Sequence, residues 1–378
     1  MKSEIEKIRA LFPVTKSLIY FNHAGTGPIS IPAQQAIQEC LSVYSRQAEF
    51  DLDKYFERVR SRRAIVARLI GADPEEITFT HNTSQGILIA LTNLPLQPGD
   101  KILIMEEVFP AVRYIVDYNL PSFEKLYVSF CGKDSVEVVK NNLDRKVKAV
   151  VIDYAQYLSG EMIDLERLSR FLREREIFLV VDAIQAIGAV DFNVRKTEVD
   201  YLACGSAKWL FGPSGAGFLF VNKRNFGSLK RFHTGWLGAQ WYDFEDCQKR
   251  PALYRDARMF ELGTRNVMGI SAFSENIKIL LEYGLENIEV RISALKSLLR
   301  DHFGELKYRI ITPENSPQSG IITIRPDNAR SLYDLLLANK ITVSLRSNCL
   351  RFSPHFYNTE QEVEKIFEIL KRKTVSSV

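Results

Sequence analysis

The stretch "YLACGSAKWLFGPSGAGFLF", residues Tyr201 to Phe220, decides the fold. It contains two apolar runs of strand length on either side of a glycine-rich turn. A lone lysine, Lys208, follows the first run and lies among Gly, Ser and Ala residues. Because a buried lysine amine is costly, we expect Lys208 to have a partner or a lowered pKa. A neutral lysine amine forms Schiff bases with carbonyl compounds, so Lys208 is a candidate catalytic residue.

Apolar strands alternate with helical segments from about Glu76 to Val221. Nearly continuous apolar strands in this alternation indicate a parallel sheet with helices on both faces, which is an α/β fold. Ligands of such folds bind at the carboxyl ends of the strands. The strands that carry the prediction are "EEITFT", "DKILIM", "VKAVVIDYA", "IFLVVDA" and "VDYLACG".

The sequence changes character after about Gly269. A long helical stretch leads to short strands such as "SGIITIRP" and "CLRFSPH" and to a final helix with capping-box spacing at its start. This order predicts a smaller C-terminal α+β domain. We expect an N-terminal segment (1–20) that packs with the small domain, a large domain (21–268) and the small domain (269–378).

Polar residues follow each strand of the large domain. In a parallel sheet they converge on one edge, where a carboxylate, an amine, hydroxyls and an aromatic ring suit a small, polar, partly aromatic ligand. Taken singly, Asp182 fits a helix N-cap as well as a catalytic role, and Phe109 fits the core. The residues in question are His81, Asn82, Thr83, Ser84, Glu106, Glu107, Phe109, Gln156, Tyr157, Asp182, Gln185, Ser206 and Lys208.

Composition excludes several classes of protein. The 378 residues carry a formal net charge of +4 without a basic arm or stripe, so nucleic acid is not an expected partner. The cysteines are scattered and odd in number, which favours a reducing, cytoplasmic location over a disulfide framework. No apolar run reaches membrane-spanning length, and no histidine pair has helical ligand spacing, so we expect neither a membrane segment nor a metal site. A GxxxxGK[ST] nucleotide loop is also absent.

Seven motifs together resemble the class V aminotransferase group of fold-type I pyridoxal-phosphate (PLP) enzymes. This group includes cysteine desulfurases, isopenicillin-epimerase-like and kynureninase-like proteins. The resemblance covers nearly the whole chain and implies PLP as cofactor, a mostly parallel seven-stranded sheet and a smaller C-terminal α+β domain. The motifs are "YFNHAGTGPIS", "THNTSQGI", "EEVFPA", "VVDAIQAIGAVDFNV", "GSAKWLFGPSGAGFLFV", "FELGTRN" and "LRFSPHFYNTEQEV".

The resemblance implies roles around the PLP ring. Lys208 corresponds to the lysine that forms the Schiff base and then moves the proton at the substrate Cα. Asp182 corresponds to the carboxylate opposite the pyridine nitrogen, and Gln185 to the donor to the ring's phenolic oxygen. Phe109 occupies the position of the aromatic ring that stacks on the cofactor.

The resemblance also implies how the phosphate is bound. Thr83 and Ser84 open a helix whose N–H groups suit the dianion, and Ser206 is a further candidate. In related proteins the position of Thr264 reaches the phosphate of the neighbouring subunit, which implies a homodimer with shared active sites. Ala207 departs from the pattern, because many members have His immediately before the lysine, and this leaves the exact phosphate contacts open.

Substrate binding is implied for a third set of residues. Arg351 corresponds to the arginine that binds the substrate carboxylate through a bidentate fork, and Arg346 is a second candidate. The other residues expected on the substrate side are Asn22, His23, Gln156 and Tyr157.

The expected function is that of a PLP-dependent aminotransferase acting at the α-carbon of an amino acid. A C–S lyase or desulfurase-like reaction and an epimerase are the enzymatic alternatives, and a catalytically silent PLP-fold binding protein is the non-enzymatic one. We expect no persulfide on Cys349, since it lies two residues before Arg351 in a predicted strand and has little freedom to move.

Overall fold

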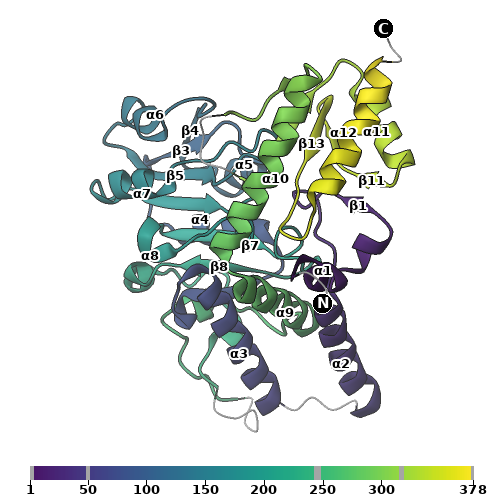
Figure 1. The fold of residues 1–378 in the computed structure, drawn as a ribbon. Helices are drawn as coiled ribbons and strands as arrows, with labels where there is room; N and C mark the ends of the chain where they lie inside the picture. The colour runs from purple at the N-terminus through teal and green to yellow at the C-terminus, as the bar shows by residue number, and fades with distance from the viewer. Residues whose placement is uncertain (1–3, 48–51, 242–247, 315–318, 376–378) are drawn as a thin grey trace.

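A mostly parallel sheet forms the centre of the molecule (Figure 1). The computed structural model describes residues 4–47, 52–241, 248–314 and 319–375. Within these residues the sheet has seven strands in the order β2-β8-β7-β6-β5-β3-β4, and only β8 runs antiparallel to its neighbours. The strands are β2 (Ile77–Thr80), β3 (Lys101–Met105), β4 (Glu124–Val128), β5 (Val147–Asp153), β6 (Phe178–Asp182), β7 (Tyr201–Gly205) and β8 (Gly217–Val221). The predicted fold class, an α/β fold with a mostly parallel seven-stranded sheet and a smaller second sheet, is confirmed.

Helices cover both faces of this sheet (Figure 1). Several of these helices begin at a residue whose side chain caps the first turn. Asn82, Asp134, Asp164 and Asn266 each accept a hydrogen bond from a backbone N–H in the first turn of the helix that follows. The helices of the large part are α2 (Ile31–Gln47), α3 (Leu52–Ile70), α4 (Thr83–Asn93), α5 (Pro110–Asn119), α6 (Ser135–Asn141), α7 (Leu165–Arg173), α8 (Val194–Thr197) and α9 (Val267–Tyr283). Among the residues that the structure describes, no helix is long and apolar enough to cross a membrane.

The C-terminal part has its own sheet and its own apolar core. The sheet is antiparallel in the order β12-β13-β10-β9, and β11 pairs with β1 from the N-terminal segment in a parallel two-stranded ladder. The elements are α1 (Glu4–Ala10), β1 (Ile19–Tyr20), α10 (Leu285–Glu305), β9 (Arg309–Ile310), β10 (Ile322–Arg325), α11 (Ala329–Ala338), β11 (Ile341–Thr342), β12 (Ser344–Arg346), β13 (Cys349–Phe352) and α12 (Glu360–Val375).

The two apolar cores divide within α10. The domain boundary at residue 269 stays a prediction. Ile288 and Ile292 in the first half of α10 belong to the core of the large sheet, together with the buried residues of α9. Leu295 and Leu299 in the second half belong to the core of the small sheet. The apolar pattern of α9 and α10 marked both as helices, but it did not say which sheet each would cover.

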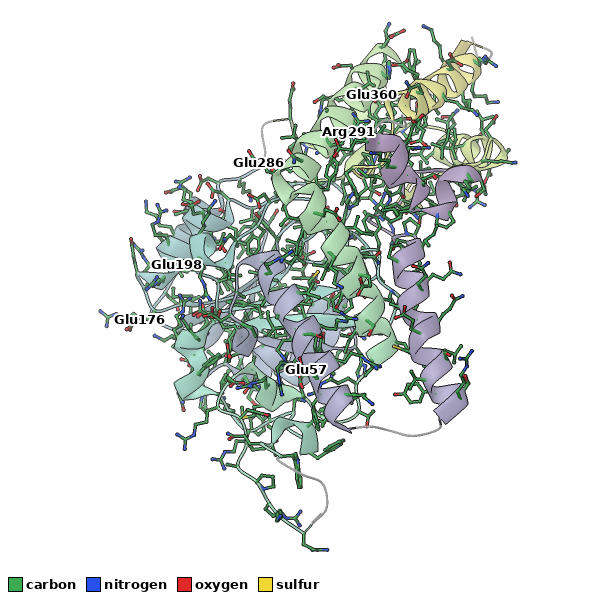
Figure 2. The ribbon with its side chains drawn as sticks, turned by 60° about the horizontal axis from the view of Figure 1, so that its bottom comes forward. Glu57, Glu176, Glu198, Glu286, Arg291 and Glu360 are labelled. Carbon is green, nitrogen blue, oxygen red and sulfur yellow. The ribbon has the colours of Figure 1, made fainter. Side chains whose placement is uncertain are left out.

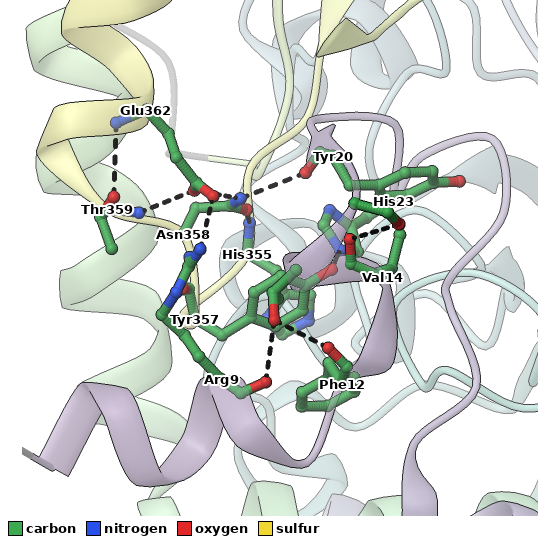
Figure 3. Close-up of polar contacts among 12 residues, drawn as sticks. Arg9, Phe12, Val14, Tyr20, His23, His355, Tyr357, Asn358, Thr359 and Glu362 are labelled. Atoms are coloured by element: carbon green, nitrogen blue, oxygen red, sulfur yellow. Dashed lines mark hydrogen bonds and ion pairs between the residues drawn. The ribbon is translucent and has the colours of Figure 1, made fainter. Parts of the chain in front are cut away.

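Two arginines form polar contacts that hold α1, α10 and α12 together. Arg291 on α10 forms an ion pair with Glu360 at the start of α12, and Figure 2 shows the two side chains together. Arg9 on α1 donates to the Tyr357 carbonyl over 2.9 Å and pairs with Glu362 over 2.8 Å (Figure 3). Arg9 and the strand β1 of the N-terminal segment therefore lie against the C-terminal part.

Candidate active site

A pocket of about 440 Å³ opens where the parallel strands end. Residues of the large part supply most of its wall, and two arginines of the small part complete it. The pocket therefore lies between the two parts of the chain, at the sheet edge where α/β folds bind ligands. The predicted site residues that line it are Thr83, Ser84, Phe109, Tyr157, Asp182, Gln185, Ser206, Lys208, Arg346 and Arg351.

Lys208 lies in the turn after β7, and its Nζ atom is 5.6 Å from the centre of the Phe109 ring. Removal from water, together with the positive charges of Arg351 and Arg346 and against the attraction of Asp182, lowers the pKa of Lys208 to about 8. At neutral pH a larger fraction of the amine is therefore neutral than for a solvated lysine, and the neutral amine is the nucleophile.

Asp182 ends β6 and is almost fully buried. One carboxylate oxygen accepts the Ile184 N–H over 3.0 Å. Burial raises the pKa of Asp182 to about 6, while that hydrogen bond and the charge of Lys208 oppose the rise. A cationic partner in the same pocket would therefore stabilise the ionised form of Asp182.

The N-terminus of α4 faces the pocket through Thr83 and Ser84. Thr83 Oγ1 accepts the Gly205 N–H over 2.9 Å, which leaves its own hydroxyl hydrogen available to an anion. Ser206 also lines the pocket, and its hydroxyl lies 2.9 Å from the carbonyls of Pro213 and Ala216 within the glycine-rich turn. A hydroxyl has one hydrogen, so in this arrangement it holds the turn, and a contact with a phosphate stays a prediction.

Gln185 is fixed by two long-range contacts. Its amide oxygen accepts the Trp209 indole N–H over 3.0 Å, and its amide nitrogen donates to the Ala24 carbonyl over 3.1 Å. The second amide hydrogen remains for a ligand.

Arg351 on β13 is 1% exposed, yet it is incompletely bonded. Its Nη1 donates to the Tyr157 carbonyl over 2.5 Å, whereas its Nε and Nη2 atoms are buried without a hydrogen-bond partner. Burial lowers the pKa of Arg351 to about 9, with a further contribution from Arg346. Unpaired donors on a buried cation destabilise the folded protein. An anion that pairs with the Nε and Nη2 donors of Arg351 would remove this penalty, so the site suits an anion.

The other predicted substrate residues separate into two groups. Tyr157 lines the pocket, and its ring meets Phe109 edge to face at 5.3 Å. The neighbouring Gln156 turns inward instead, because its amide oxygen accepts the N–H groups of Leu158 and Ser159 and so closes a tight turn. Gln156 thus closes the loop beside the pocket and is not among the residues that line it, and its role toward a substrate stays a prediction.

His23 and Asn22 are not among the residues that line the pocket, and their role on the substrate side stays a prediction. The His23 ring is fully buried, with Nδ1 2.7 Å from the Ser353 carbonyl. Its Nε2 lies 2.7 Å from the hydroxyl of Tyr357, and both residues are labelled in Figure 3. Both ring nitrogens are used, and burial lowers the pKa of His23 to about 3, so it stays neutral in the core. Asn22 lies beneath Gly25, whose missing side chain leaves the space that the amide of Asn22 fills.

Thr264 lies outside this pocket, in an adjacent hollow of about 250 Å³. The two hollows share only His81 and Gly215. Thr264 is exposed at the rim of this hollow, so it is available to another copy of the chain.

Asp153 is the site residue that the sequence reasoning missed. It ends β5 as Asp182 ends β6, and together with Phe109, Asp182 and Lys208 it lines a narrow cavity of about 10 Å³ that adjoins the main pocket. A signal was present, since "VVID" places a carboxylate at the end of an apolar strand in the same way as "LVVD" does.

Comparison with known proteins identifies the family of this chain. The model of the aminotransferase class-V family matches residues 19–366. The chain belongs to the class V aminotransferase family. Members of this family use PLP, so the protein is a PLP-dependent enzyme, and the residues around the pocket suit that cofactor: a lysine of lowered pKa, a buried carboxylate, an aromatic ring and a helix N-terminus.

The relatives of this class V protein are named for different reactions. It is 23% identical over 370 residues to the uncharacterized aminotransferase YcbU of Bacillus subtilis (strain 168), with 98% of each chain covered. It is 26% identical over 402 residues to a probable cysteine desulfurase of Pyrococcus abyssi (strain GE5 / Orsay), covering 97% of this chain and 96% of the relative. Among solved structures, a C-DES mutant with glycine covalently linked to its PLP cofactor has a TM-score of 0.89 at 21% identity, covering 96% of this chain and 98% of the other. At these identities the family is shown and the individual reaction is not.

Proposed function

We propose that the protein is an aminotransferase that acts at the α-carbon of an amino acid. The observation that carries the proposal is the pair of unbonded Arg351 donors, which face the same pocket as Lys208. A carboxylate bound to Arg351 places the amino acid within the pocket where the lysine amine lies. Arg346, exposed at the pocket wall, adds positive charge for the same anion.

The chain's own groups divide the work. Lys208 would hold the cofactor covalently and move protons at Cα, and Asp182 would keep the pyridine nitrogen protonated. Thr83, Ser84 and the N–H groups at the start of α4 would bind the phosphate, while Phe109 would cover the ring and Gln185 would donate to its phenolic oxygen. When bound, PLP supplies an electron sink for the bond broken at Cα.

A screen of the purified holoenzyme against the common amino acids tests this function. Each amino acid is incubated with and without a 2-keto acid, and four products are measured separately: the pyridoxamine form of the cofactor, pyruvate, sulfide and the inverted stereoisomer. Aminotransfer predicts the pyridoxamine form and an acceptor-dependent new amino acid. Pyruvate or sulfide without an acceptor would contradict it in favour of a lyase.

Lysis of a C–S bond by PLP chemistry without a cysteine nucleophile is the second candidate. It uses the same lysine, carboxylate and arginine, and the observation that favours it over a persulfide-forming desulfurase is the position of Cys349. Cys349 is fully buried on β13, where its thiol lies 3.3 Å from both the Ser347 carbonyl and Arg325 Nε. Ser347 and Asn348, both with positive φ, close a two-residue hairpin directly before it, so no long loop carries the thiol.

We therefore predict that cysteine leaves no persulfide on Cys349. After incubation with cysteine and trapping by alkylation, the wild type and Cys349→Ser should give the same product rates within about twofold, because a buried strand thiol acts as a small apolar side chain. Cys40, Cys131 and Cys204 do not line the pocket, and Cys247 lies outside the described residues. An alkylated persulfide on Cys349, together with turnover lost in the variant, would assign the protein to the desulfurases.

We further propose that the active unit is a homodimer that shares its PLP sites through Thr264. The exposed position of Thr264 outside its own chain's pocket supports this proposal. Thr264→Ala should weaken retention of PLP about tenfold, the effect of removing one hydrogen bond to a charged group. Retention is measured by the absorbance that remains with the protein after dilution and filtration.

A mixed dimer separates sharing between subunits from a contact within one chain. If Thr264 serves the partner's site, a dimer of one Lys208→Ala chain and one Thr264→Ala chain contains one intact site and one doubly altered site. Tight PLP binding then returns to about half of the wild-type amount. If the mixed dimer retains PLP no better than Thr264→Ala alone, or if a fully active monomer sediments, the sharing proposal fails.

A further inference from the structure

Asp153 and Asp182 form a pair of buried carboxyl groups at the ends of neighbouring strands. β5 and β6 are parallel, and their register places Asp153 directly opposite Asp182. Aligned residues of adjacent parallel strands point to the same face about 5 Å apart. Both side chains accordingly line the narrow cavity next to Lys208, and Asp153 is 3% exposed and Asp182 5% exposed.

The two oxygens of Asp153 have different surroundings. Oδ2 accepts the Phe109 N–H over 2.9 Å, which ties the loop before α5 to the end of β5. Oδ1 is buried and has no hydrogen-bond partner. An ionised carboxylate with an unpaired, desolvated oxygen is strongly unfavourable, whereas a protonated one turns that oxygen into a hydroxyl donor.

The charges around Asp153 favour the protonated form. Burial raises its pKa most, the negative charge of Asp182 raises it further, and the Phe109 N–H and the charge of Lys208 oppose the rise without cancelling it. Cys204 on β7 is held as a neutral thiol by burial. Glu107, on the loop from β3, is engaged with the Phe130 N–H over 3.1 Å.

We propose that Asp153 is a positioning residue of the PLP site that carries a proton on Oδ1 while Oδ2 anchors the Phe109 backbone. The carboxyl pair then holds one negative charge, located on Asp182, instead of two. A single charge matches the single positive charge of a protonated pyridine ring, and the anchored Phe109 covers the cavity beside Lys208. The inference rests on the proposed PLP site and deepens it.

Infrared difference spectroscopy of the full-length holoenzyme tests the proton directly. A protonated carboxyl has a carbonyl stretch well separated from that of a carboxylate, and this band shifts in heavy water. At pH 8, where Asp182 is ionised, the spectrum of wild type minus Asp153→Asn should contain one such band, and the band should fade as pH rises through the pKa of Asp153. Asp200→Asn is the matched control, because Asp200 is equally buried but its charge is met by Arg224 at 2.9 Å, so the band should be unchanged.

Two substitutions test the anchoring. Asparagine keeps an oxygen for the Phe109 N–H and an N–H donor in place of the hydroxyl, so Asp153→Asn should retain PLP within about twofold of wild type. Asp153→Ala leaves the Phe109 N–H without its acceptor and should retain PLP about tenfold less well. Absence of the infrared band, or equal loss of PLP in both variants, would overturn the proposal. The band is read without turnover, so a substrate screen that contradicts aminotransfer leaves this test intact.

Discussion

Lys208→Ala will contain no PLP that borohydride reduction can fix to the protein. Lys208 lines the pocket, and its pKa of about 8 gives it a larger neutral fraction at neutral pH than a solvated lysine has. In the wild type, reduction followed by peptide mapping should place the pyridoxyl group on the peptide that contains Lys208. Turnover should fall by at least about a thousandfold, because the variant loses both the covalent anchor and the acid–base group.

Lys296 is the matched control for this experiment. It is also a buried lysine whose pKa is lowered, to about 7, and its amine donates to the Ser319 carbonyl. It lies on α10 and does not line the pocket. Lys296→Met should keep the reducible adduct. A pyridoxyl group on Lys296, or an adduct that survives in Lys208→Ala, would show that burial alone had been mistaken for function.

Arg351→Met should lower kcat/KM for the amino-acid substrate by about a hundredfold to a thousandfold, while the absorbance of bound PLP is unchanged. Removing one partner of a buried charge pair costs about 2–5 kcal/mol, and here the loss of the Arg351 guanidinium leaves the substrate carboxylate unpaired. Methionine matches the length of the arginine stem, and the fold should tolerate it because the free protein loses two unpaired buried donors.

Two further variants define the role of the arginine. Arg351→Lys should recover only part of the loss, because an ammonium group keeps the charge but not the planar fork. Arg346→Met should cost less than Arg351→Met, since Arg346 is exposed and its charge is screened by water. If Arg346→Met lowers kcat/KM as much as Arg351→Met or more, Arg346 would be the main arginine that binds the substrate carboxylate. An unchanged kcat/KM in Arg351→Met would remove the observation on which the proposed function depends.

The sequence alone determined the sheet and the approximate position of its active edge. Apolar runs of strand length, each followed by polar residues, are a local property, and in a parallel sheet their ends must meet. This is why Lys208, Asp182, Phe109 and Thr83 could be assigned to one pocket before the structure was known. The assignment of PLP needed the family resemblance as well, since several cofactors bind at such an edge.

Only the tertiary structure decided which neighbouring side chains enter the pocket. Tyr157 lines it and the adjacent Gln156 does not, because a turn uses the Gln156 amide. His23 is withdrawn by Ser353 and Tyr357, residues more than 300 positions away. Such contacts join segments distant in the chain, so no local pattern reports them.

The register of β5 against β6 likewise determines whether Asp153 faces the narrow cavity next to Lys208. The sequence shows two strands that end in aspartate, but a shift of one residue would have turned one carboxyl to the opposite face of the sheet. Pairing across the sheet brings the two carboxyl groups into one cavity and leaves Oδ1 of Asp153 buried without a partner. Composition and spacing determined which groups this protein has at its active edge, and packing between distant segments decided which of them face one another in the same cavity.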